Sequence, residues 1–121
     1  MGLEYKGGRA SPASIGQGDL PRKIRLMHVW RHLPSATNAK FRIRLAPSSQ
    51  SRFMIDGEGE DGWVDRPARR ISSGQFGTAV RHDLRLSARQ PLSADARARF
   101  QVRAVAPDDT MTRTLSILVT A

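Results

Sequence analysis

Three segments of this chain alternate apolar residues with arginine, and this alternation constrains the fold more than any other feature. The segments cover residues 40–45 (KFRIRL), 80–86 (VRHDLRL) and 97–103 (RARFQVR). Because successive side chains of a β-strand point to opposite faces, each segment has one apolar face and one charged face. Such strands are typical of an antiparallel sheet that packs one face on a core and exposes the other to solvent.

The whole chain divides into segments of this kind, separated by turns rich in Pro, Gly, Ser and Asp. We expect seven strands, at residues 23–31, 40–46, 52–56, 68–73, 78–88, 96–106 and 111–120. Strands at this spacing predict an all-β fold, an immunoglobulin-like antiparallel β-sandwich. In the first strand the apolar alternation changes phase near Met27, which predicts a β-bulge there.

The same alternation sorts side chains into a core set and a solvent set. The predicted core set is Phe41, Ile43, Leu45, Phe53, Ile55, Val80, Leu84, Leu86, Phe100, Val102, Leu115, Ile117 and Val119. The predicted solvent set includes Arg42, Arg44, Arg81, Arg85, Arg99 and Arg103.

The first 22 residues have a different character, rich in Gly, Ser and Pro and without periodicity. A segment of this composition has too few apolar groups to pack by itself. We therefore predict that residues 1–22 form a flexible, extended arm, and that residues 23–121 form a single sandwich domain. An arm of this kind would lie on a partner or on a neighbouring copy of the chain.

The charge balance points to acidic partners. The chain has 20 basic and 11 acidic residues, a net charge of +9, and only three of the basic residues are lysine. Such a surface attracts phosphate, acidic proteins or anionic lipid. The predicted partner-binding residues are Arg42, Arg44, Arg85, Arg99, Arg103 and Trp63. A sequence-tolerant nucleic-acid-binding protein that uses this arginine-rich sheet face is one alternative, and it would bind in a salt-dependent way.

Residues 56–65 (DGEGEDGWVD) form an acidic loop with five of the chain's 11 acids. Carboxylates at Asp56, Glu58 and Glu60 resemble the ligand spacing of calcium loops, although the positions of the glycine and of the closing Glu do not match an EF-hand. A second interpretation is that the loop docks on the arginine face of another copy. Trp63 either stacks on a bound sugar or folds back on the sandwich.

Motifs for catalysis are weak. His28 and His32 are four residues apart, a spacing that would suit zinc on a helix, but the segment is predicted to be a strand. His82-Asp83 is not accompanied by a nucleophile motif. There is no cysteine and no apolar run long enough to cross a bilayer. We expect no enzyme activity and no cofactor. The N-terminus has no secretory signal, which favours cytoplasmic synthesis or a virion component.

Taken together, these features predict a non-enzymatic structural or assembly module. It would be a small component of a larger, oligomeric particle, of the virion decoration or adaptor type, and would dock on protein through its arm and charged surfaces. An extracytoplasmic accessory domain that binds a ligand or calcium is the remaining alternative.

Overall fold

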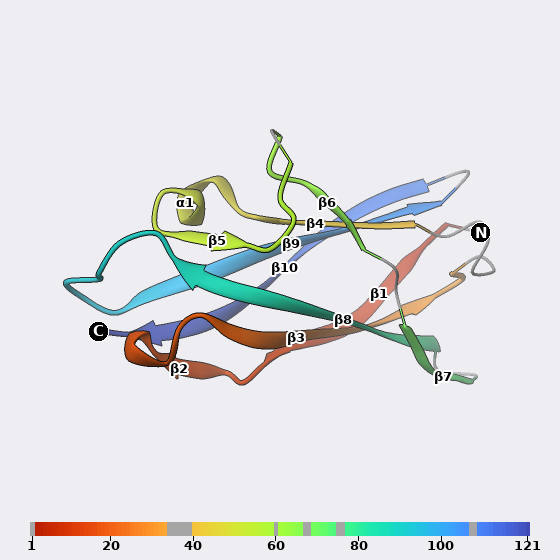
Figure 1. The fold of residues 1–121 in the computed structure, drawn as a ribbon. Helices are drawn as coiled ribbons and strands as arrows, with labels where there is room; N and C mark the ends of the chain where they lie inside the picture. Colours follow the sequence, from red (N-terminus) through yellow and green to blue (C-terminus); the bar gives the residue numbers. More distant parts are fainter. Residues whose placement is uncertain (1, 34–39, 60, 67–68, 75–76, 107–108) are drawn as a thin grey trace.

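The fold is a sandwich of two β-sheets. The computed structural model describes residues 2–33, 40–59, 61–66, 69–74, 77–106 and 109–121. Long strands of both sheets run across the molecule, and helical structure in the described part is limited to the turn α1 (Pro47–Gln50) and the 3-10 turn η1 (Gln17–Asp19) (Figure 1). The predicted all-β sandwich is confirmed.

The first sheet has the strand order β1-β3-β8-β5, with β7 also paired to β8. These strands are β1 (Glu4–Ser11), β3 (Arg22–Arg31), β8 (Gly77–Ala88), β5 (Phe53–Ile55) and β7 (Arg69–Gly74). The strands β5 and β7 share one edge of β8: β5 pairs near the end of β8 and β7 pairs near its start.

The second sheet has the order β2-β10-β9-β4-β6. Its strands are β2 (Ser14–Gly16), β10 (Asp109–Thr120), β9 (Ala96–Ala106), β4 (Lys40–Leu45) and β6 (Val64–Arg66). The short strand β2 runs parallel to β10, and the other pairs are antiparallel. The strands β1, β3, β8 and β7 of one sheet and β10, β9, β4 and β6 of the other correspond, in pairing and in chain order, to the ABED and GFCC′ sheets of immunoglobulin-type sandwiches.

The core lies between the sheets, where the apolar faces of the alternating strands meet. Every residue of the predicted core set is buried, with exposed fractions between 0% and 7%. Additional core residues come from β3, with Ile24, Leu26 and Trp30 all buried. Burial of each large apolar side chain stabilises the fold by about 1.5–3 kcal/mol relative to exposure. Because alternate side chains of a strand point to opposite faces, burying the apolar residues places the arginines between them on the outer surface.

The N-terminal segment differs from the prediction of a separate arm. Strand β1 pairs with β3 along most of its length, β2 pairs with β10, and Leu3, Ala10 and Ile15 are buried. The arm prediction is therefore wrong for residues 4–16.

Two glycines explain why this strand had no visible periodicity. Gly7 has a φ of +133° and lies at a shift in the β1–β3 register, which breaks the two-residue repeat. At Gly8 the chain packs so closely on β3 that a Cβ atom would lie 2.7 Å from the Met27 carbonyl oxygen. What resembled a flexible Gly-Gly linker is a closely packed bulged strand.

The bulge predicted near Met27 is also wrong. Strand β3 pairs with β8 in continuous register from Arg22 to Trp30, and its burial alternates without interruption. The phase of the apolar pattern appeared to change because His28 is a core residue, 1% exposed, whereas Met27 faces outward. The irregularity lies in the neighbouring strand β1.

Candidate docking surface: the arginine face

The outer surface of the second sheet carries five arginines on two adjacent strands. We call this surface the arginine face and define it as Arg42 and Arg44 of β4 with Arg97, Arg99 and Arg103 of β9. They point to solvent because the residues between them are buried. Register places Arg42 directly opposite Arg103, and Arg44 opposite Gln101. Like charges directly opposite one another are destabilising, so this pairing requires compensation.

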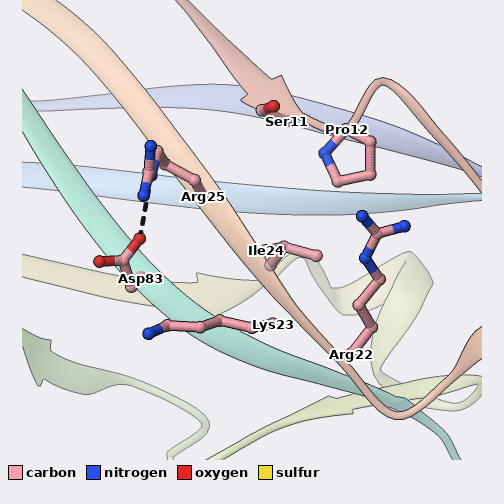
Figure 2. A pocket seen from close by; sticks show the side chains of 7 residues that line it. All are labelled: Ser11, Pro12, Arg22, Lys23, Ile24, Arg25 and Asp83. Carbon is pink, nitrogen blue, oxygen red and sulfur yellow. Dashed lines mark hydrogen bonds and ion pairs between the residues drawn. The ribbon is translucent and has the colours of Figure 1, made fainter.

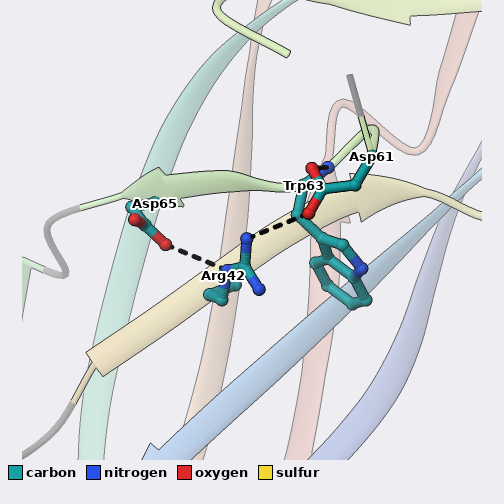
Figure 3. A network of polar contacts seen from close by, with 4 residues as sticks. All are labelled: Arg42, Asp61, Trp63 and Asp65. Atoms are coloured by element: carbon teal, nitrogen blue, oxygen red, sulfur yellow. Dashed lines mark hydrogen bonds and ion pairs between the residues drawn. The ribbon is translucent and has the colours of Figure 1, made fainter. Parts of the chain in front are cut away.

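Compensation at Arg42 comes from the acidic loop and β6. The Nε of Arg42 donates to Oδ1 of Asp65 at 3.0 Å, and its Nη2 lies 3.4 Å from Oδ2 of Asp61 (Figure 3). The β4–β6 register places Asp65 opposite Arg42. One guanidinium thus bridges two carboxylates at the corner of the face.

Trp63 lies between these two acids and folds back on the sheet. The guanidinium carbons of Arg103, Arg44 and Arg42 are 4.2, 4.5 and 5.7 Å from the centre of its ring. Cation–π attraction at such distances favours this arrangement, and the arginines leave Trp63 only 8% exposed. Its backbone N–H donates to Oδ1 of Asp61 at 3.0 Å, which holds the turn together. The indole is therefore not open for stacking on a sugar or a base.

Three of the other four arginines of the face have neutral partners. The Nε of Arg44 donates to Gln101 at 2.6 Å, and the Nε of Arg103 donates to Thr112 at 3.2 Å. Arg97 reaches the Ser116 hydroxyl at 3.4 Å, and Arg99 is exposed. Among the described residues, no carboxylate forms an ion pair with any of these four arginines. Within the described part of the chain, these four arginines therefore have no carboxylate that neutralises them.

The structure separates one predicted binding residue from the others. Arg42, Arg44, Arg99, Arg103 and Trp63 lie together, but Arg85 belongs to β8 in the first sheet, where it faces Lys23. Alternation shows that a residue points outward but not from which sheet. Arg97, which belongs to the face, was absent from the predicted set although its place in the alternating β9 segment could have identified it.

The acidic loop is held by its own chain. Oδ1 of Asp56 accepts the backbone N–H of Arg85 at 2.7 Å, and Glu58 pairs with Arg89 at 2.7 Å. The Nε of Arg89 also donates to the carbonyl oxygens of Gln50 and Phe53. Of the predicted calcium ligands, Glu60 lies outside the described residues, and the described residues contain no cluster of three or more metal-ligating side chains.

The first sheet has a basic groove of about 250 Å³ on its outer side, lined by Ser11, Pro12, Arg22, Lys23, Ile24, Arg25 and Asp83 (Figure 2). Its cations do not converge: Arg22 points towards Pro12, whereas Lys23 extends away from it (Figure 2). Arg25 is engaged by Asp83 at 3.2 Å. Burial would raise the pKa of Asp83, but the hydrogen bond from Arg25 and the charges of Arg81 and Lys23 outweigh it and hold that pKa below its ordinary value.

The histidines do not form a reactive site. His28 and His82 are both 1% exposed, and their Nε2 atoms are 2.8 Å apart inside the core. The Trp30 indole N–H donates to Nδ1 of His28, so neutral His28 carries its proton on Nε2 and donates it to His82. Burial, and secondarily the neighbouring His82, lowers the pKa of His28 to about 3.

The motifs considered for catalysis are split by the sandwich. His82 points into the core while Asp83 lies on the outer face with Arg25 and Arg81, so the two cannot act as base and orienting acid. His28 is buried, whereas the exposed His32 follows the end of β3. The described helices include none long and apolar enough to cross a membrane.

Comparisons with known proteins add a weak structural likeness. No protein-family model and no curated protein matches the sequence. Among solved structures, the chain is similar to self-complemented MyfA, the major subunit of Myf fimbriae from Yersinia enterocolitica, with a TM-score of 0.41 and 11% identity over 98% of each chain. A likeness of this size supports no conclusion about function. The class of protein, a two-sheet sandwich with immunoglobulin-type strand order, follows from the sheets themselves.

Proposed function

We propose that this chain is a non-enzymatic assembly module that docks on an acidic protein partner through its arginine face. The observation that carries the proposal is the set of four arginines, on adjacent strands, whose described partners are all neutral. Complementary charge across an interface steers association and fixes the orientation of the partners. Carboxylates of another molecule would complement a surface of this kind.

A foreign partner fits this surface better than a second copy of the chain. Seven described carboxylates already have partners in their own chain, namely Glu4, Asp56, Glu58, Asp61, Asp65, Asp83 and Asp95. With a net charge of +9, two copies repel each other at long range. The N-terminal segment is used within the sandwich, so the proposal rests on the charged surface. Docking of the acidic loop on another copy, and the virion decoration or adaptor role, stay predictions.

Protein is favoured over nucleic acid by the state of the aromatic residues. Proteins that bind single strands combine a basic surface with exposed aromatic rings on which bases stack. Here Phe41, Phe53 and Phe100 are in the core and Trp63 is covered by arginine. On the arginine face, as far as the structure describes it, a nucleic acid would therefore be bound through its phosphates alone. The following experiment distinguishes that mode of binding from the proposal.

The test compares two charge-reversal variants that change the net charge equally. In one, Arg97→Glu and Arg99→Glu alter the arginine face; in the control, Lys23→Glu and Arg85→Glu alter the outer side of the first sheet. The probe is a poly-glutamate peptide, with binding measured by titration calorimetry and by amide shifts of the labelled chain. Exposed ion pairs contribute about 0.2–1 kcal/mol each, so we expect the face variant to lose roughly tenfold in affinity, and the control much less.

Two results would contradict the proposal. An equal loss in both variants would show that attraction depends on the net charge and not on the arginine face. Tighter binding of an oligo-dT strand than of the peptide, with amide shifts on β4 and β9, would show that the arginine face binds nucleic acid and not an acidic protein. Thermal melts of both variants provide the folding control.

A further inference from the structure

The chain's own acidic segment shows what kind of ligand the arginine face accepts. Asp61, Trp63 and Asp65 are alternate residues, and all three side chains are directed at the arginine face (Figure 3). The carboxylates of Asp61 and Asp65 bind the guanidinium of Arg42, and the ring of Trp63, which lies between these acids in the sequence, packs against the guanidinium of Arg44. The segment is therefore an internal ligand, a turn at Asp61–Gly62 that leads into strand β6, and it occupies the Arg42 corner.

We propose that the partner of the arginine face is an extended protein segment with carboxylates on alternate residues, which lies over Arg44, Arg97, Arg99 and Arg103. This inference rests on the proposed function and names the form of its partner. Alternate residues of a strand project from the same face at intervals of about 6.8 Å. Arg97 and Arg99 on β9 have this spacing, and so do alternate acids of an extended partner.

The geometry of the face suits an approach from above more than strand addition at an edge. Facing sheets pack about 10 Å apart, a separation that an arginine and a glutamate side chain span together. The neighbouring strand β10 presents Thr112, Thr114 and Ser116 on the same side, opposite Arg103, Gln101 and Arg99. These hydroxyls can donate to the same carboxylates or to the backbone of the partner.

Arg44 and Arg103 are already held in place for such a ligand. Each is fixed by a hydrogen bond, to Gln101 and to Thr112 respectively, and each lies on the Trp63 ring. Side chains held in one geometry lose less conformational entropy when a ligand binds. The buried tryptophan thus serves as a platform for the arginines and does not contact the partner itself.

The spacing is tested with two peptides of equal length and composition, both with blocked ends. One alternates Glu and Thr, and the other has all Glu in one block followed by all Thr. In an extended conformation the block peptide directs half of its carboxylates away from the face. We expect titration calorimetry to show the alternating peptide binding about fivefold tighter, the effect of losing one or two exposed ion pairs.

Equal affinities of the two peptides would overturn the inference about spacing. That outcome would leave the proposed function intact, provided that the Arg97→Glu, Arg99→Glu variant still weakens both peptides more than the Lys23→Glu, Arg85→Glu control does. Loss of that difference between the variants would instead contradict the proposed function itself.

A second variant tests whether the internal segment occupies part of the same surface. Replacing Asp61→Asn and Asp65→Asn releases Arg42 from its two carboxylates while keeping side chains of nearly the same shape. We expect the alternating peptide to bind a few-fold tighter to this variant, because a fifth arginine becomes available. Unchanged or weaker binding, with an unchanged melting temperature, would show that the segment is not a substitute for the partner.

Discussion

The two outer surfaces of this sandwich are both basic, yet they handle their charge in different ways. On the first sheet, Asp83 lies among the cations and pairs with Arg25 and Arg81 at 3.2 and 3.7 Å. On the second sheet, the carboxylates Asp61 and Asp65 are confined to the corner at Arg42. A central acid neutralises its neighbours, whereas acids at a corner leave the rest of the surface positive. The number of arginines is therefore less informative than the position of the few acids among them.

The inner surfaces of the two sheets differ as well. We expect low pH to reveal this difference most strongly, through its effect on the free energy of unfolding. The first sheet buries His28 against His82, and both rings contact Phe41 of the second sheet. Because the pKa of His28 is about 3 in the folded chain against an ordinary 6.5, the unfolded chain takes up a proton first as the pH falls. Stability is therefore complete above about pH 6.5 and is lost progressively below it.

We expect this effect to reach about 2–3 kcal/mol at pH 4.5, since each pH unit is worth up to about 1.4 kcal/mol. Urea unfolding between pH 7.5 and 4.5 measures it, a window that lies above the titration of Asp83. A His28→Leu variant should lose most of the slope, and His32→Asn, which alters the exposed histidine, should keep it. A wild-type stability that stays constant over this range would contradict the buried neutral pair.

The next largest effect concerns the close approach of β1 to β3. In a Gly8→Ala variant the new methyl group would lie 2.6 Å from the Tyr5 hydroxyl and 2.7 Å from the Met27 carbonyl oxygen. Overpacking against backbone costs roughly 1–3 kcal/mol, so we expect a clear fall in the urea midpoint. Gly18→Ala, where a Cβ has no neighbour within 4 Å, is the matched control. If both variants are equally stable, β1 is not seated on the first sheet as described.

The smallest effect compares the acids of the two outer surfaces directly. Asp83→Asn removes a carboxylate from among Arg25, Arg81 and Lys23 and leaves those cations to repel one another, which we expect to cost about 1 kcal/mol. Asp65→Asn removes a carboxylate whose side chain is 86% exposed, and should cost less than about 0.5 kcal/mol. Urea unfolding at pH 7 in low and in high salt separates the two. A reversed order would overturn the distinction between a central and a corner acid.

The strands of the core could be read from the sequence because their alternation is regular. In β4 and β9 every second residue is apolar, and in β8 the inward positions are apolar except for Thr78 and His82. The predicted inward side chains of these strands are all buried. Prediction failed where residue type did not reveal burial. Strand β1 has glycines at its bulge, β3 places His28 in the core, and β2 and β6 are each three residues long.

The arginine face could be predicted only in part, for a related reason. Alternation identifies Arg42, Arg44, Arg99 and Arg103 as outward, but it identifies Arg85 equally, and that residue lies on the other sheet. The sequence also contains the acidic loop, but not the register that places Asp65 opposite Arg42. Which arginines are neutralised depends on pairing between strands that are distant in the chain.

The alternating pattern of the sequence is enough to predict an all-β sandwich with an apolar core and an arginine-rich exterior, because strands with a two-residue period are stable when one face is buried and the other is solvated. Only the packing of the whole chain shows that the N-terminal segment completes both sheets, that two histidines share the core, and that four arginines of one surface have no carboxylate partner among the residues that the structure describes. These features depend on strand partners, and cross-strand neighbours are set by packing over the whole molecule and not by local residue preference.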